Sequence, residues 1–145
     1  KKLNLGYDLF DAIMDSREKQ AKNMAKYLEN LSKKNKLDIC IHGKAYKPDV
    51  PYLDGSYSTL VGSFCSKLGK KVIYVDPFFK NNIKSIKGVI LLAHNSKITY
   101  PEKNIKDKLQ YKQYCDFKPG SIVVDPWRRY TTNKKIKVIY YGNTR

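Results

Sequence analysis

The N-terminal hydrophobic pattern predicts one long amphipathic helix over residues 7–31. Its apolar positions recur three or four residues apart, with charged side chains between them, at Leu9, Phe10, Ile13, Met14, Met24, Tyr27, Leu28 and Leu31. A cluster of serine, lysine and asparagine at residues 32–36 is expected to end this helix.

Five later segments are short, apolar and rich in β-branched residues, and this pattern predicts strands at 37–41, 72–75, 89–93, 121–124 and 136–141. A helix capped by Ser56 is expected to run to about residue 68, where Gly69 suits its end, and a charged helix is expected within residues 103–115. The alternation predicts an α/β fold: a three-layer, Rossmann-like, doubly wound and mainly parallel five-stranded sheet preceded by the long helix. The expected division is residues 1–36 for the helix and 37–145 for one α/β domain.

The formal net charge of +16 has two interpretations. Nucleic-acid binding would use such a field. Only four of the 29 basic residues are arginine, however, and lysine is spread along the whole chain instead of being gathered into one stripe. We therefore favour a solvated surface combined with the codon bias of an A/T-rich genome, and nucleic-acid binding is kept as the less favoured alternative.

Cysteine usage is typical of a reducing, cytoplasmic setting. Cys40, Cys65 and Cys115 are widely spaced and odd in number, so neither a disulfide framework nor a zinc site is expected. We expect them inside a strand, inside a helix and at a helix end, as core thiols.

No apolar run has the roughly 18 residues of a membrane helix. No signal peptide is expected at the start, and a start without Met indicates that the chain is cut from a longer protein.

The fold rules predict where a ligand site would lie. In open α/β sheets, ligands bind beyond the carboxyl ends of the strands, where the strand order reverses. If the five predicted strands are ordered 3-2-1-4-5, the loops after the first and fourth strands flank that point. Those loops, 42–49 and 125–130, carry cations and aromatic rings, namely Lys44, Tyr46, Lys47, Trp127, Arg128 and Arg129. Such a crevice suits a nucleoside diphosphate, whose phosphates pair with cations while its base stacks on a ring.

The first loop is not a dinucleotide-binding fingerprint. It has one glycine, Gly43, where the motif G-x-G-x-x-G needs three, and the next helix starts about a dozen residues later. No Walker A motif is present. NAD is therefore not expected to bind this chain.

The same loop resembles a known family. The run Ile41-His42-Gly43-Lys44-Ala45-Tyr46-Lys47-Pro48-Asp49-Val50, followed by a helix and by Gly69-x-x-Val72-x-x-x-Asp76-Pro77, is similar to the C-terminal, UDP-binding domain of UDP-glucose/GDP-mannose dehydrogenases. The segments ending at His94 and Asp125, and the long helix itself, extend the resemblance over nearly the whole chain.

The resemblance implies roles for individual residues. Lys47 would contact the sugar nucleotide, Tyr46 would pack near the base, and Lys44 lies at a position where the family tolerates many residues. The family has a substrate-binding arginine two residues after the aspartate that matches Asp125. Trp127 stands at that place, so Arg128 or Arg129 would take the role.

The sequence also departs from the family. In the family pattern D-x-R-x-S, the arginine is replaced by Asp54. Complete enzymes of this family oxidise the C6 alcohol of a sugar to a carboxylate with NAD and a catalytic cysteine. The motif of that cysteine and an N-terminal NAD domain do not occur in these residues. The resemblance thus implies a UDP-sugar-binding domain that lacks its catalytic and NAD-binding half, with no catalytic residue of its own.

A second hypothesis is a non-catalytic binding or oligomerisation module, which the replacement by Asp54 and the shifted arginine pair favour. The resemblance also implies that the long helix links two domains and helps to build a homodimer. Several candidate residues also have structural interpretations. We expect hydrogen-bonded structural roles for His42 and His94, and turn or capping roles for Asp76 and Asp125.

Overall fold

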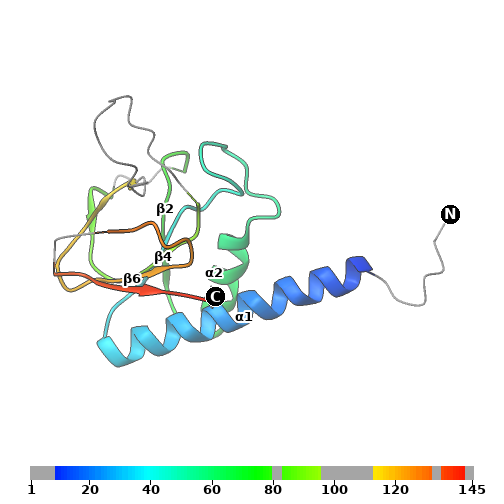
Figure 1. Ribbon diagram of the computed structural model, residues 1–145, viewed down its shortest axis with the longest axis horizontal. Coiled ribbons are helices and arrows are strands. Elements are labelled where there is room, and N and C mark those ends of the chain that lie inside the picture. Colours follow the sequence, from blue (N-terminus) through cyan, green and yellow to red (C-terminus); the bar gives the residue numbers. More distant parts are fainter. Residues whose placement is uncertain (1–8, 80–82, 96–112, 132–134, 143–145) are drawn as a thin grey trace.

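A computed structural model describes residues 9–79, 83–95, 113–131 and 135–142 of the 145-residue chain. It contains an open five-stranded sheet with a long N-terminal helix against one face (Figure 1). The prediction of an α/β fold with a parallel five-stranded sheet preceded by a long helix is confirmed.

The five strands of the main sheet are all parallel. They are β1 (Ile39–His42), β2 (Val72–Val75), β4 (Val89–Leu92), β6 (Ile122–Asp125) and β7 (Lys137–Tyr140). Their order across the sheet is β2-β1-β4-β6-β7. The three central strands are buried along their whole length, whereas β2 and β7 at the two edges are partly exposed.

The expected strand order was wrong. The third predicted strand, β4, lies between β1 and β6 instead of at an edge. Its sequence explains this position, because Val-Ile-Leu-Leu has no polar residue and is buried on both faces of the sheet. The edge strands contain polar residues such as Tyr74, Lys137 and Tyr140, which need access to solvent.

Residues of alternating parity in the central strands face two separate cores. Ile39, Ile41 and Leu91 pack with the two helices, α1 (Leu9–Asn35) and α2 (Tyr57–Lys67). Cys40 and Ile90 face the other core, which includes residues from a short parallel pair, β3 (Ser85–Ile86) and β5 (Asp116–Phe117). The two-residue strands β3 and β5 were not predicted, because so short a segment has no readable alternation.

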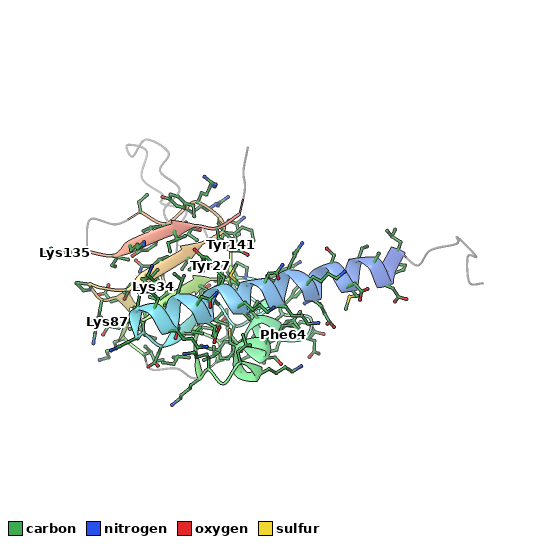
Figure 2. All side chains as sticks on the ribbon, turned by 90° about the horizontal axis from the view of Figure 1, so that it is seen from below. Tyr27, Lys34, Phe64, Lys87, Lys135 and Tyr141 are labelled. Atoms are coloured by element: carbon green, nitrogen blue, oxygen red, sulfur yellow. The ribbon has the colours of Figure 1, made fainter. Side chains whose placement is uncertain are left out.

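The long helix is divided into a packed half and an exposed half. From Ala21 onward it buries Met24 and Leu28 against α2 and the sheet, and Tyr27 packs on Tyr141 with ring centroids 5.1 Å apart (Figure 2). The first half extends past the body of the protein, as Figure 1 shows. Its apolar residues are exposed there, namely Leu9, Phe10, Ile13 and Met14.

Helix boundaries follow local signals. Ser56 caps α2 by accepting a hydrogen bond from the Thr59 amide at 3.3 Å, as predicted. At the other end Gly69 has φ +74°, and the amides of Gly69 and Lys70 donate to Ser66 and Cys65 carbonyls, a Schellman ending. The predicted end of α1 at the polar cluster came too early. The helix continues to Asn35 because lysine and asparagine tolerate helical geometry, and it stops at Lys36, which has φ 53°.

The charged helix expected within residues 103–115 lies mostly outside the described residues. The described part, residues 113–115, is not helical and leads into β5, so Cys115 precedes a strand. Cys40, Cys65 and Cys115 are all buried and unpaired. Within the described residues, no helix has the length and apolar character needed to cross a membrane.

Candidate functional site

The strand order reverses between β1 and β4, so the switch point of this sheet lies there and not between β1 and β6. The chain leaves β1, forms β2 on one side, and then crosses to form β4 on the other. The loop after β1 and the residues after β4 therefore meet directly. The loop after β6 approaches from the next position in the sheet.

The loop after β1 is held down by Asp76. One carboxylate oxygen of Asp76 accepts the amides of Lys44 and Ala45 at 2.8 and 2.9 Å, and the other accepts the Phe78 amide at 3.0 Å. Asp76 is 2% exposed, so these bonds are shielded from water. A second support comes from the Ser56 hydroxyl, which donates to the Lys44 carbonyl at 2.8 Å. The expected turn role of Asp76 is confirmed, and it fixes the loop that carries three of the predicted ligand residues.

His94 joins the end of β4 to the same loop. Its Nε2 lies 2.7 Å from the carbonyl oxygen of Ala45. Its ring also packs on Gly43, where an added Cβ would lie 2.6 Å from the imidazole. The Nδ1 atom is buried and has no hydrogen-bond partner among the described residues. The structural role expected for His94 thus holds for one ring nitrogen, while the other is an unpaired polar atom at the switch point.

The loop after β6 has the same construction around Asp125. This carboxylate, which is 0% exposed, accepts the amides of Trp127, Arg129 and Tyr130 at 2.7–2.8 Å. The Trp127 indole N–H then donates to the Leu92 carbonyl at 2.9 Å, which ties this loop to the end of β4. Both loops therefore contact the carboxyl end of β4, one through His94 and the other through Trp127.

The predicted ligand residues do not all converge. Lys47 lies over the Tyr46 ring with its ammonium 5.4 Å from the centroid, and Tyr46 is half-exposed. The Lys44 ammonium lies 5.3 Å from the centroids of both Tyr74 and Phe79, toward the β2 edge. There it lines an open groove of about 660 Å³.

Arg128 and Arg129 diverge in the same way. Arg128 has φ 55°, lies over the Tyr140 ring at 5.7 Å and donates to the Gly142 carbonyl, so it is directed toward the β7 edge. The Nη1 atom of Arg129 is buried without a hydrogen-bond partner among the described residues. Arg129 therefore has a buried donor that could bind an anion, whereas Arg128 is directed toward the β7 edge.

His42 is completely buried at the end of β1. Its Nε2 accepts the Tyr114 amide at 2.8 Å, and the two rings stack 4.6 Å apart. Burial, followed by the nearby His94, lowers the pKa of His42 to about 3. His42 is therefore neutral near pH 7, and its hydrogen-bonded structural role is confirmed.

The thiols are held in the neutral form. Burial raises the pKa of Cys65 and of Cys115 to about 11, and it raises the pKa of Cys40 as well. A thiol in this state is a poor nucleophile at neutral pH. The described residues hold no group of three or more histidine, cysteine or acidic side chains placed to bind a metal ion.

The fold defines an α/β protein whose candidate site lies at the carboxyl end of a parallel sheet. Comparison with known proteins gives no closer assignment: no protein-family model, no curated protein and no solved structure matches the chain.

Proposed function

We propose that the carboxyl end of the sheet binds a nucleotide sugar, with a UDP-sugar as the first candidate. In this proposal the chain is the C-terminal binding domain of a UDP-glucose 6-dehydrogenase-like oxidoreductase, and its fold is a Rossmann-like, three-layer, doubly wound domain. The sequence resemblance to that family supports the assignment.

The main observation behind the proposal is that the loop after β1 is held in a fixed position at the point where the strand order reverses. A loop with two lysines and a tyrosine is fixed over the strand ends by Asp76 and His94. In the loop after β6, Arg129 Nη1 is a buried donor without a partner among the described residues. Such a donor is costly, and a ligand with acceptor oxygens would satisfy it. His94 Nδ1 is also buried without a partner among those residues, but because Nε2 donates to the Ala45 carbonyl, Nδ1 of the neutral ring is an acceptor.

The ligand class follows from the residue types. Arg129 and Lys47 would pair with the diphosphate, because a guanidinium and an ammonium are the usual phosphate partners in proteins. The base would stack on Tyr46 and Trp127, whose side chains are both partly exposed. Lys44 and Arg128 face opposite edges of the sheet, so they would contribute mainly to the field that attracts the anion.

The oxidation itself would need parts outside this chain. A separate domain would supply NAD and the catalytic cysteine, and the residues of this chain would bind and orient the sugar nucleotide. The proposal includes a cytoplasmic location, since all three cysteines are free, and a homodimer in which the exposed half of α1 is covered.

A non-catalytic binding or oligomerisation module is the second candidate. Asp54 replaces an arginine of the family pattern, and its carboxylate accepts a hydrogen bond from Tyr52, which raises the pKa of that phenol. A carboxylate beside the loop after β1 repels a diphosphate instead of attracting it. This substitution favours a ligand with less negative charge, or none.

Calorimetric titration of the chain with UDP, UDP-glucose and GDP-mannose tests the proposal. We expect saturable binding of one uridine ligand, weakened about tenfold or more in Lys47→Ala and in Arg129→Ala. Lys19→Ala, which removes an exposed lysine of α1, is the matched control and should bind as the unmodified chain does. Equal weakening in all three variants, or no binding at millimolar ligand, would contradict the proposal and leave the non-catalytic module.

A further inference from the structure

Lysines that are far apart in the sequence gather at the amino edge of the sheet. In a parallel sheet, the segments that enter the strands all meet at one edge. Each of the five strands is entered through lysine: Lys33, Lys34 and Lys36 before β1, Lys70 and Lys71 before β2, Lys87 before β4, Lys118 before β6, and Lys135 with Lys137 at β7. The topology thus produces the cluster that the sequence spacing hides.

Side-chain contacts and the view in Figure 2 agree on this placement. Lys34, Lys87 and Lys135 lie at the same end of the molecule in Figure 2, opposite the free end of α1. Lys87, Lys135 and Lys137 line one groove of about 320 Å³ together with Gly120. Gly120 joins two of them, since its amide donates to the Lys135 carbonyl at 2.7 Å and the Lys87 side chain packs over its Cα.

Little negative charge offsets these lysines. In the five entering segments, 33–38, 70–71, 87–88, 118–121 and 135–136, Asp38 is the one carboxylate. Lys33 is paired with Glu29. Nearly all of the cluster is exposed to solvent. The edge therefore presents a band of net positive charge.

We infer that the amino edge is a second binding surface, distinct from the carboxyl-end site, and that it holds the phosphate backbone of a duplex nucleic acid. Five strands at the usual ~4.8 Å separation span about 19 Å. One strand of a DNA duplex carries a phosphate about every 3.4 Å along the axis, so the edge matches about five to six base pairs. Lysine ammonium groups act as point charges, which suits backbone phosphates and predicts binding without sequence preference.

The distribution of apolar side chains disfavours a lipid surface as the partner. Binding in a membrane interface needs exposed apolar groups beside the basic ones. Apart from Leu68, the large exposed hydrophobic residues that the structure describes lie on the first half of α1 or at the carboxyl end of the sheet. The phosphate backbone of a nucleic acid can be bound through charge alone, so it fits the amino edge better than a lipid surface does.

The test is fluorescence anisotropy of a labelled duplex of arbitrary sequence, titrated with the chain between about 50 and 200 mM salt. The informative variant is Lys87→Gln/Lys135→Gln/Lys137→Gln. The matched control is Lys19→Gln/Lys22→Gln/Lys26→Gln, which removes the same charge from exposed positions on α1. Each phosphate contact contributes about −0.9 to the slope of log K against log salt. We expect the first triple variant to weaken binding at least tenfold and to reduce that slope by about 2–3, while the control keeps the slope.

Three outcomes would overturn the inference. Equal losses in the two triple variants would show that net charge alone attracts the duplex. Absence of duplex binding at low salt would show that the amino edge does not bind a nucleic-acid duplex. Binding to vesicles with anionic lipids, lost in the first variant while duplex binding is absent, would assign the edge to a membrane surface.

Discussion

The two ends of the sheet are built differently, although both are basic. At the carboxyl end, buried carboxylates and His94 fix each loop, and the cations lie among aromatic rings. At the amino edge, the lysines lie on short connections and most of them are exposed. The first arrangement holds polar atoms at defined positions, which shape-specific recognition requires. The second arrangement supplies charge without a fixed geometry.

Net charge and the way in which it is used are therefore separate properties of a surface. Polar groups at fixed positions recognise a compact ligand through the directions of their donors, whereas a band of lysines recognises any regular array of phosphates. Perturbing the carboxyl end should therefore affect stability and binding together. Perturbing the amino edge should affect binding alone.

The largest expected effect follows from removing the buried carboxylate at the carboxyl end. Asp76→Ala leaves the amides of Lys44, Ala45 and Phe78 without their acceptor. We expect the free energy of unfolding to fall by about 4 kcal/mol, because hydrogen bonds to a charged group contribute roughly 1.5–3 kcal/mol each and are not fully additive. Urea denaturation measures the change.

The exposed acid of the amino edge is the matched control for Asp76. Asp38→Ala is expected to change the free energy of unfolding by less than about 0.5 kcal/mol, as surface substitutions usually do. Similar losses for both variants would show that the two ends are not organised differently.

A second comparison uses two glycines with positive φ. Gly43→Ala places a Cβ 2.6 Å from the His94 ring at φ +96°, and we expect a loss of about 3 kcal/mol from strain and overlap. Gly69→Ala, at the end of α2, meets nothing within 4 Å, so only strain of about 1 kcal/mol is expected. Thermal unfolding of the two variants tests this difference, and equal losses would contradict the close packing of Gly43 on the His94 ring.

The dependence of stability on pH should also involve the carboxyl end, because burial lowers the pKa of His42, which lies at the end of β1. His42 has a folded pKa of about 3, below its ordinary value of 6.5. Between these values the unfolded chain binds a proton that the folded chain does not. Stability is therefore complete above about pH 6.5 and falls as the pH decreases, by up to about 1.4 kcal/mol per pH unit.

Chemical denaturation between about pH 7.5 and 5 measures this slope. His42→Gln keeps a hydrogen-bond acceptor for the Tyr114 amide and removes the titrating group. The slope should be shallower in the variant by the amount assigned to His42. An unchanged slope would mean that another group carries the dependence.

The smallest effect is expected at the amino edge. The triple variant Lys87→Gln/Lys135→Gln/Lys137→Gln should unfold within about 0.5 kcal/mol of the unmodified chain, with a slight gain at low salt from reduced repulsion. Denaturation at low and high salt measures this. A loss above 1 kcal/mol would show that these side chains are part of the packing.

The sequence predicted the elements better than their arrangement. The strands were found because fully buried strands are continuous apolar runs, and α2 was bounded correctly because Ser56 and Gly69 leave local signals. The strand order was predicted wrongly because a strand's position depends on how completely it is buried. Burial depends on the neighbouring strands as well as on the strand's own sequence. The same limit concealed the amino-edge lysines, which lie as far apart as Lys33 and Lys137 in sequence and meet only through the parallel topology.

The candidate site was predicted in part. The two loops were identified correctly as extensions of strand carboxyl ends, but the divergence of Lys44 and Arg128 depends on the neighbouring rings Tyr74, Phe79 and Tyr140. The unpaired atoms of His94 and Arg129 were not predicted, because hydrogen-bond satisfaction is a property of the packed structure.

The most direct test of two separate surfaces is a pair of amide chemical-shift titrations of the isotope-labelled chain, one with UDP and one with a short DNA duplex. We expect UDP to shift the amides of Lys44–Lys47 and Trp127–Tyr130, and the duplex to shift those of Lys70, Lys71, Lys87, Gly88, Lys118, Gly120 and Ser121. If both ligands shift the same residues, the chain has one anion-binding surface and the distinction between the two ends is wrong.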